Sequence, residues 1–259
     1  MYETILLDHR GGVSTITLNR PPLNIVTPRR MEELHAAFDL LEAREETRCV
    51  VLTGSGTRAF CAGADLGDEA RHNPAEGREF RDSGRRAVER IETFPKPVVA
   101  AIRGWCIGGG TGLAWPCDIR VAAESARFRA GDVYLGIIPT WSIGMVRLVH
   151  YIGRNRTLDT LLLGEDITAA QALDLGIVSR VCPDDRFEAE VARIADRLAS
   201  GAPLAMRAIK EAVRAQYWDN PDRAAVLEER SAQRVLASKD AKEGMTAFKE
   251  KRKPTFTGR

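Results

Sequence analysis

The sequence predicts an α/β fold with mostly parallel strands, followed by a helical C-terminal region. Residues 49–54 and 97–102 are short apolar runs, the pattern of parallel strands that are covered on both faces. Helical patterns separate these runs, and strands that alternate with helices are typical of a parallel sheet. From about residue 184 onward the pattern is helical almost throughout. These observations predict an α/β core with a helical appendage.

The chain begins with a predicted β-hairpin and a helix. Residues 3–9 and 13–19 are rich in β-forming residues and flank a tight-turn signal at 10–12. Thr27 and Pro28 supply a helix N-cap and a first-turn proline, and apolar residues then recur at helical spacing. We therefore expect a hairpin that leads directly into an amphipathic helix.

Later segments continue the alternation and then change character. We expect a polar helix at about 77–94 and a further buried strand at 119–122. The helices expected near the C-terminus are 186–199, 203–217, 221–237 and 239–250. Because isolated helices need an apolar partner surface, we expect this region to pack across a subunit interface.

The composition excludes several classes of protein. With 44% hydrophobic residues and a net charge of +2, the chain can bury a core, which argues against disorder. No stretch approaches the roughly 20 apolar residues that span a bilayer. Lys and Arg number 38 against 36 Asp and Glu, which gives no general footprint for nucleic acid. The N-terminus lacks the pattern of a signal peptide, so we expect a cytoplasmic protein.

The cysteine and histidine patterns predict no metal site. The five cysteines lack Cys-x-x-Cys spacing, and the four histidines are scattered. We expect the cysteines to be small buried hydrophobes in a reducing compartment. Their positions are 49, 61, 106, 117 and 182.

Two glycine-rich turns are the first candidates for chemistry. Residues 60–66 follow the 49–54 strand, and residues 104–113, with three consecutive glycines, follow the 97–102 strand. Glycines at a helix start let a ligand approach the backbone and leave N–H groups unpaired. Two such turns at adjacent strand ends could aim two N–H donors at one oxygen, forming an oxyanion hole. Tight packing is the simpler explanation of either turn alone.

Other glycine and serine motifs are absent. No G-x-x-x-x-G-K-[ST] sequence occurs, and the glycines at 108–112 do not fit G-x-G-x-x-G. The G-x-S-x-G elbow of serine hydrolases is also missing. A nucleotide-binding protein or an α/β-hydrolase is therefore a poor interpretation.

An ordered set of motifs resembles the crotonase superfamily, the enoyl-CoA hydratase/isomerase fold. The matching segments are 17–21 with Asn24, 60–65, 96–102 with the glycines from 104 to 110, 117–122, 135–139, 169–178 and 244–252. They keep the family's order over nearly the whole chain. The resemblance implies a crotonase-like ββα spiral core at 1–198 and a C-terminal helical trimerisation region at 199–259.

The resemblance also implies chemistry on an acyl-CoA thioester through an enolate. The N–H groups of Ala64 and Gly109 match the family's two donors to the thioester oxygen, which would stabilise charge in the transition state. Coenzyme A would arrive as part of the substrate, with no permanently bound cofactor. The implied CoA-binding residues are Ala62, Ala64, Asp65 and Leu66, with Phe248 and Lys251 reaching a neighbouring subunit in a trimer or dimer of trimers. The basic run around Lys251 is alternatively a solvated helix face.

The sequence departs from the family at its acid/base residues. Typical hydratases carry two glutamates, which activate a water and deliver its proton. Gly112 stands at the first position and Asp132 at the second. We therefore expect Asp132 to be the acid/base, with a pKa that burial beside an acyl chain raises. In the alternative interpretation Asp132 only caps the turn that it begins.

Large aromatic residues indicate a reshaped substrate pocket. Trp115 follows the glycine helix and Trp141 follows Pro139, and with Gly112 they are the expected pocket residues. Two indoles would favour a compact or planar acyl group. Packing of both in the core is at least as common.

The sequence thus predicts an acyl-CoA-processing enzyme of the hydratase/isomerase type. One carboxylate suits double-bond isomerisation, and a specialised hydration is the broader expectation. The alternatives are decarboxylation, C–C bond cleavage, thioester hydrolysis, or an acyl-CoA-binding protein that has lost catalysis.

Overall fold

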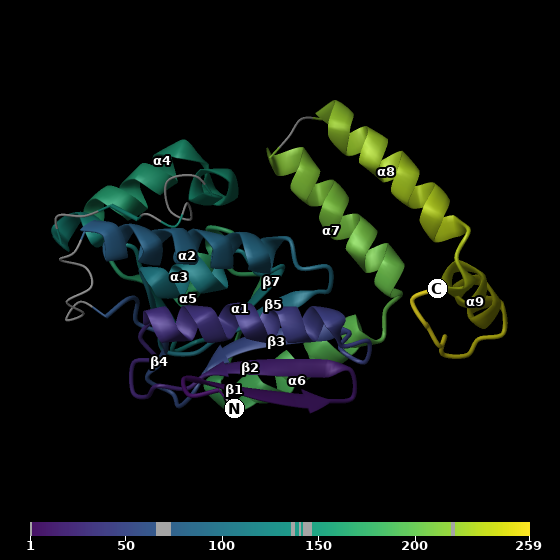
Figure 1. The fold of residues 1–259 in the computed structure, drawn as a ribbon, viewed down its shortest axis with the longest axis horizontal. Coiled ribbons are helices and arrows are strands. Elements are labelled where there is room, and N and C mark those ends of the chain that lie inside the picture. Colours follow the sequence, from purple (N-terminus) through teal and green to yellow (C-terminus); the bar gives the residue numbers. More distant parts are fainter. Residues whose placement is uncertain (1, 66–73, 136–137, 140, 142–146, 219–220) are drawn as a thin grey trace.

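Two sheets organise the computed structural model, which describes residues 2–65, 74–135, 138–139, 141, 147–218 and 221–259 (Figure 1). The larger sheet has the strand order β1-β2-β3-β5-β7-β10. Its strands are β1 (Ile5–Arg10), β2 (Val13–Leu18), β3 (Cys49–Gly54), β5 (Val98–Ile102), β7 (Ile119–Ala123) and β10 (Arg180–Cys182). The β1–β2 hairpin is antiparallel and every other neighbouring pair is parallel, which confirms the predicted hairpin and parallel sheet.

A second, smaller sheet lies beside the first and was not predicted. Its order is β4-β6-β8-β9, for strands β4 (Ala59–Cys61), β6 (Trp105–Ile107), β8 (Arg127–Arg129) and β9 (Ile167–Thr168). The first three are parallel to one another. Each follows a long strand: β4 follows β3, β6 follows β5, and β8 follows β7. This repeated pair of strands followed by a helical segment is the expected ββα arrangement.

Helices cover the core on both faces of the larger sheet (Figure 1). They are α1 (Pro28–Ala43), α2 (Pro74–Glu92), α3 (Gly109–Ala114), α4 (Leu148–Leu163), α5 (Ala169–Asp174) and α6 (Phe187–Ala199). Helix α1 begins as predicted, because the Thr27 side chain accepts a hydrogen bond from the Arg30 N–H. The predicted boundaries of α2 and α6 differ from the observed ones by no more than three residues.

The apolar runs are buried on both faces, as expected for internal parallel strands. Val50 and Leu52 belong to the main core, to which α1 contributes Leu34. Val51, on the opposite face of β3, packs in a second core with Ile194 of α6. Full burial of one such side chain contributes about 1.5–3 kcal/mol. These two cores fix the sheets that carry the turns described below.

The C-terminal helices extend to one side of this core (Figure 1). They are α7 (Pro203–Trp218), α8 (Pro221–Leu236) and α9 (Lys239–Lys249), and α7 lies beside α8. Lys210 Nζ contacts Asp118 Oδ2 at 2.6 Å and the Lys96 carbonyl at 2.9 Å, which joins α7 to the core. Helix α6 ends at Ala199, one residue past the expected division at 198/199, and the division into two regions remains a prediction.

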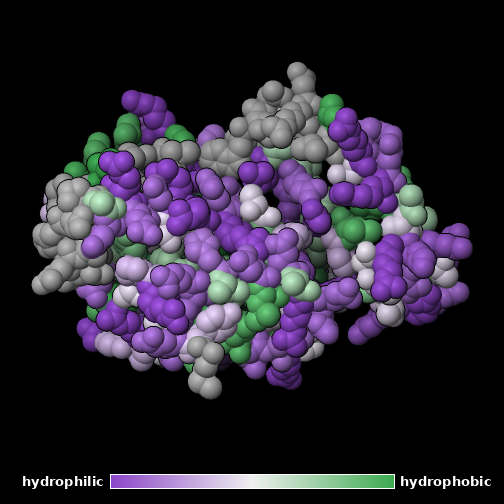
Figure 2. Space-filling view, in the orientation of Figure 1, coloured by the Kyte–Doolittle hydropathy of each residue, from purple (hydrophilic) through white to green (hydrophobic). Residues whose placement is uncertain are grey.

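The surface is mostly hydrophilic on the face shown in Figure 2, with small apolar patches. No helix within the described ranges is long and apolar enough to cross a membrane. All five cysteines are buried thiols, and burial raises the pKa of Cys61 to about 11. They therefore behave as the small buried hydrophobes that were expected. Within the part of the chain that is described, no group of three or more metal-ligating side chains gathers.

Candidate active site

Three turns lie side by side at the carboxyl ends of β4, β6 and β8. Ala64 follows the end of β4 by three residues, Gly109 follows β6 by two, and Asp132 follows β8 by three. Carboxyl ends of adjacent parallel strands meet at one edge of a sheet, where ligands commonly bind. Neighbouring strands are about 4.8 Å apart, so the three strand ends span about 10 Å. The fold thus brings the three predicted catalytic residues to one edge.

The Ala64 amide faces away from its neighbouring segment. Val26 forms a parallel bridge with Ala64: its N–H donates to the Gly63 carbonyl at 2.8 Å, and its carbonyl accepts from the Asp65 N–H at 3.1 Å. In a parallel bridge the N–H of the central residue points to the other side. The Ala64 N–H therefore points away from Val26.

The Gly109 amide lies close to the Ala64 amide. A Cβ built on Gly109 would be 3.6 Å from the Ala64 nitrogen, and one built on Gly63 would be 3.7 Å from the Gly109 nitrogen. Gly109 is the first residue of α3, where N–H groups have no partner within the helix. Neither amide donates a hydrogen bond to another residue in the described ranges. Two donors that have no partner among the described residues thus lie a few ångströms apart.

Two glycines make this close approach of the turns possible. Gly63 has a φ of 94° and Gly108 a φ of 49°, backbone conformations that side chains disfavour. A Cβ built on Gly63 would also lie 3.1 Å from the Ile107 carbonyl. The Gly108 N–H donates to the Arg129 carbonyl at 3.1 Å, which joins the end of β6 to the end of β8.

Asp132 is a half-buried carboxylate that begins a 3₁₀ turn, Asp132–Leu135. Burial raises its pKa, and a hydrogen bond from its own backbone N–H opposes this rise. No ion pair joins it to a Lys, Arg or His among the residues that the structure describes. The Tyr134 hydroxyl donates to the Leu162 carbonyl at 3.2 Å, which ties the turn to α4. A carboxylate with a raised pKa and no cation can exchange protons.

Trp141 covers the turns from the side of α2. The residue is 6% exposed, and its ring packs edge-on against Phe80 at 5.8 Å between centroids. A Cβ built on Gly112 would lie 2.7 Å from Trp141 Cε3, and one built on Gly109 would lie 3.0 Å from its Cη2. The structure therefore brings the predicted pocket residues Gly112 and Trp141 into direct contact.

The other predicted pocket residue, Trp115, packs in the core. Its side chain is 1% exposed and belongs to the main hydrophobic cluster. Its carbonyl accepts hydrogen bonds from Arg120 Nη1 and the Tyr151 hydroxyl. This burial favours the alternative interpretation, in which the indole stabilises the core.

The residues expected to bind CoA fall in two distant places. The Ala62 N–H donates to the Leu23 carbonyl at 2.9 Å, and Asp65 forms an ion pair with Arg20 at 3.5 Å. Leu66 lies outside the described residues. Phe248 is 83% exposed and Lys251 is also exposed, both near the end of α9. Helix α9 lies on the opposite side of the molecule from β4, so these two residues do not join the Ala64 turn within one chain (Figure 1).

Two buried polar residues, Asn24 and Arg30, hold the segments around the turn that carries Ala64. Only Asn24 was singled out in the sequence. Asn24 Nδ2 donates to the carbonyls of Ser55 and Ala59 at 2.9 and 2.8 Å, which fixes the start of β4. Arg30 is fully buried and donates to the carbonyls of Ile25 and Thr4. An arginine in the first turn of a helix looks solvated in sequence, so no pattern reveals Arg30.

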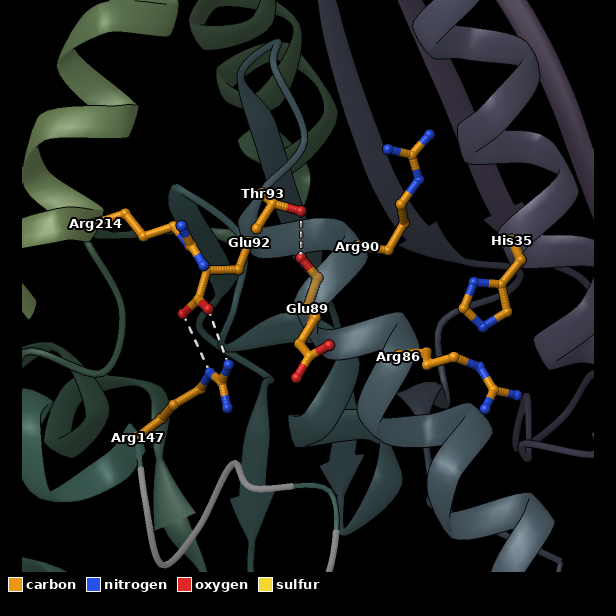
Figure 3. A pocket seen from close by; sticks show the side chains of 8 residues that line it. All are labelled: His35, Arg86, Glu89, Arg90, Glu92, Thr93, Arg147 and Arg214. Carbon is orange, nitrogen blue, oxygen red and sulfur yellow. Dashed lines mark hydrogen bonds and ion pairs between the residues drawn. The ribbon is translucent and has the colours of Figure 1, made fainter. Parts of the chain in front are cut away.

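A separate cavity of about 570 Å³ lies between α1, α2, α7 and the start of α4 (Figure 3). Its lining is strongly charged, and two of its arginines form ion pairs with carboxylates. Arg147 donates two hydrogen bonds to the Glu92 carboxylate, at 3.1 and 2.9 Å. Arg90 forms ion pairs with Asp39 and Glu42. Such pairing is typical of a structural network.

Comparisons with known proteins agree with the geometry. The family model described as enoyl-CoA hydratase/isomerase matches residues 8–259. The chain is 34% identical to a short-chain-enoyl-CoA hydratase of Clostridium acetobutylicum, over 97% of this chain and 96% of that one. It is 35% identical to a crotonyl-CoA hydratase of Syntrophomonas wolfei, over 98% of each.

Solved structures give the same result for the fold. The crystal structure of an enoyl-CoA hydratase from Bacillus anthracis superposes with a TM-score of 0.95 at 36% identity, covering 99% of this chain and 100% of that one. An enoyl-CoA hydratase structure from Geobacillus kaustophilus gives a TM-score of 0.91 at 37% identity, covering 100% and 99%. The fold, the ordered motifs and these matches establish that the chain is an enzyme of the enoyl-CoA hydratase/isomerase family, within the crotonase superfamily.

Proposed function

We propose that the enzyme moves protons on an acyl-CoA thioester, with Ala64 and Gly109 holding the enolate oxygen and Asp132 as the acid/base. The convergence of three turns at one sheet edge carries this proposal. Two preorganised N–H donors stabilise negative charge that develops on the thioester oxygen. Loss of one such donor typically lowers the rate about 10²- to 10³-fold.

Asp132 is the best-placed carboxylate for this role. Asp65, on the neighbouring turn, already forms an ion pair with Arg20 at 3.5 Å. Asp132 has no such partner among the described residues, and its pKa is raised by burial. A raised pKa brings a carboxyl closer to the operating pH, where it can both take and return a proton. This property favours double-bond isomerisation over simple charge stabilisation.

A single acid/base suits isomerisation better than hydration. In isomerisation the Asp132 carboxylate takes a proton from one carbon of the acyl chain and returns it to another, with no net change in atoms. Hydration needs a water to be held and activated as well, and Gly112 supplies no side chain for that purpose. Several relatives carry the name hydratase, so hydration of a specialised substrate is the second candidate.

Self-association completes the proposal. Ile209 and Val213 on α7 and Phe248 on α9 are exposed apolar residues. We propose that residues 199–259 form a trimerisation region, in which Phe248 and Lys251 contact the CoA bound by a neighbouring subunit. CoA is the substrate's carrier, and no resident cofactor takes part.

The test is proton exchange on a panel of 2-enoyl- and 3-enoyl-CoA thioesters in deuterated water, read by mass spectrometry. We expect deuterium incorporation and bond migration by the native enzyme. Asp132→Asn should lose both by about 10²-fold or more, with unchanged binding of CoA esters by calorimetry. The native value of kcat/KM should fall as the pH drops through the raised pKa of Asp132, since only the carboxylate accepts a proton. Undiminished exchange in Asp132→Asn would remove Asp132 from the mechanism.

The same panel separates the alternatives. Decarboxylation appears as loss of CO₂, C–C cleavage as a shortened acyl chain, and thioester hydrolysis as free CoA. Binding without any exchange or product would identify a catalytically silent acyl-CoA-binding protein.

A further inference from the structure

One indole fills a notch made by three glycines from two helices. Gly84 belongs to α2, and Gly109 and Gly112 belong to α3. A Cβ built on each of them would meet the ring of Trp141: at 2.7 Å from Gly112, at 3.0 Å from Gly109, and in a still harder collision from Gly84. Such contacts leave no room for a side chain at position 84 or 112 while the indole is in place.

The glycines are needed for space and not for backbone conformation. Gly84 and Gly112 both lie within helices, and neither has the positive φ that favours glycine. Glycine weakens the interior of a helix relative to alanine, so α2 and α3 are less stable than they would be with alanine. The close approach of Trp141 accounts for both positions. The ring and the notch are therefore a matched pair.

The notch lies directly beside the two candidate donors. The Cβ position of Gly109 that is 3.0 Å from Trp141 Cη2 is also 3.6 Å from the Ala64 nitrogen. Phe80 packs edge-on against the indole. A buried apolar ring next to the donors takes up space that water would occupy and strengthens their electrostatic effect.

We propose that Trp141 is the residue that excludes water from the acyl end of the site, so that the enzyme transfers protons and does not add water. This inference rests on the proposed function. Hydration adds a hydroxyl to the β-carbon and a proton to the α-carbon of a 2-enoyl thioester, and therefore needs a water in the space beside the donors. The indole fills that space with a flat apolar wall. The substrates that fit are short or planar unsaturated acyl groups that can lie against the ring.

The first test measures the match between ring and notch through thermal unfolding. Gly112→Ala should lower Tm by about 5 °C, because an extra methyl overpacks the site. When Trp141 is already replaced by alanine, the same Gly112→Ala change should lower Tm much less, because the indole no longer fills the notch. Gly110→Ala is the matched control in the same helix, since its Cβ would collide with the Cys61 carbonyl and not with Trp141. The loss of Tm caused by Gly110→Ala should be the same with and without Trp141→Ala.

If a single variant does not fold, the yield of soluble protein replaces Tm as the measurement in the same set of single and double variants. Recovery of soluble protein in the Gly112→Ala/Trp141→Ala pair, with none in the Gly110→Ala/Trp141→Ala pair, supports the matched notch. Equal recovery in both pairs, or in neither, contradicts it.

The second test measures water addition against proton exchange in H₂¹⁸O and in deuterated water. The native enzyme should exchange protons on the acyl chain much faster than it forms ¹⁸O-labelled 3-hydroxyacyl-CoA. Trp141→Ala should raise the ratio of hydration to exchange at least about tenfold, whereas Trp141→Phe, which keeps a ring, should stay within about threefold of native. The ratio is the readout because a general loss of folding lowers both rates together.

The outcomes separate this inference from the proposed function. Native hydration faster than exchange, or an unchanged ratio in Trp141→Ala, overturns water exclusion while acyl-CoA chemistry stands. Absence of both reactions on every thioester overturns the proposed function, and water exclusion with it. In either case, thermal unfolding of the single and double variants tests whether Trp141 and the three glycines are a matched pair.

Discussion

Glu92 and Asp132 are two carboxylates shielded from solvent, and their surroundings differ in one respect. The Glu92 side chain is 14% exposed and forms a two-bond ion pair with Arg147, whose side chain is 8% exposed (Figure 3). Asp132 is half-buried, and within the described residues it forms no ion pair. Burial raises the pKa of Asp132, with its own backbone N–H acting against the rise.

The difference separates structural from chemical use of a carboxylate. A paired buried carboxylate stabilises the fold chiefly because its removal leaves the partner's charge without compensation. An unpaired carboxylate with a raised pKa destabilises the fold slightly but remains able to exchange a proton. Variants of the two residues should therefore affect different properties of the protein.

The largest expected effect on stability is at the paired carboxylate. Glu92→Gln removes the charge that the buried Arg147 guanidinium faces through two hydrogen bonds, and should lower the free energy of unfolding by about 2–3 kcal/mol. The activity per folded molecule should not change, since the Glu92 carboxylate is bonded to Arg147 and has no part in the proposed chemistry. Thermal unfolding and specific activity of the soluble fraction measure the two properties.

The control for this prediction is an exposed ion pair. Glu190 pairs with Arg193 on α6, and their side chains are 24% and 62% exposed. Glu190→Gln should leave the free energy of unfolding almost unchanged, because solvent screens an exposed ion pair. Equal effects of Glu92→Gln and Glu190→Gln would contradict the structural role assigned to the Arg147 pair.

Asp118 is an intermediate case, at the junction between the core and the C-terminal helices. Burial raises its pKa, and Lys210 opposes this rise. Lys210→Met removes the ion pair and the bond to the Lys96 carbonyl, and should destabilise the protein by about 1–2 kcal/mol. We expect faster proteolytic cleavage of the link before α7, because α7 loses this attachment to the core. Lys210→Arg, which keeps the charge, should be cleaved more slowly than Lys210→Met.

The periodic parts of the fold were predictable from the sequence. Strands β3 and β5 are long enough to show an apolar run, and α1 shows both its cap and its helical spacing. The strands of the second sheet have only two or three residues, too few to show any period. They were missed for that reason, although they carry the turns of the candidate site.

The site was predictable only as a set of separate positions. Ala64, Gly109 and Asp132 came from motif resemblance, and the adjacency of β4, β6 and β8 explains why they belong together. Gly84 carried no signal at all, because its need for glycine arises from Trp141, which lies 57 positions later in the sequence. A contact of this kind exists only in three dimensions. The sequence showed that position 112 lacks a side chain, but it could not show that the Trp141 ring occupies that space.

The smallest effect on stability is expected at Asp132. Because its pKa is raised in the folded protein, Asp132 favours the folded state fully below its unfolded pKa, and this contribution is lost as the pH rises through the folded pKa. At pH 7 the charged Asp132 therefore opposes folding, by less than about 1 kcal/mol since solvent screens its exposed part. Asp132→Asn should raise Tm at pH 7 and have less effect at pH 4, measured by thermal unfolding at both values. A lower Tm of Asp132→Asn at pH 7 would instead favour the cap interpretation, in which the carboxylate stabilises its own turn.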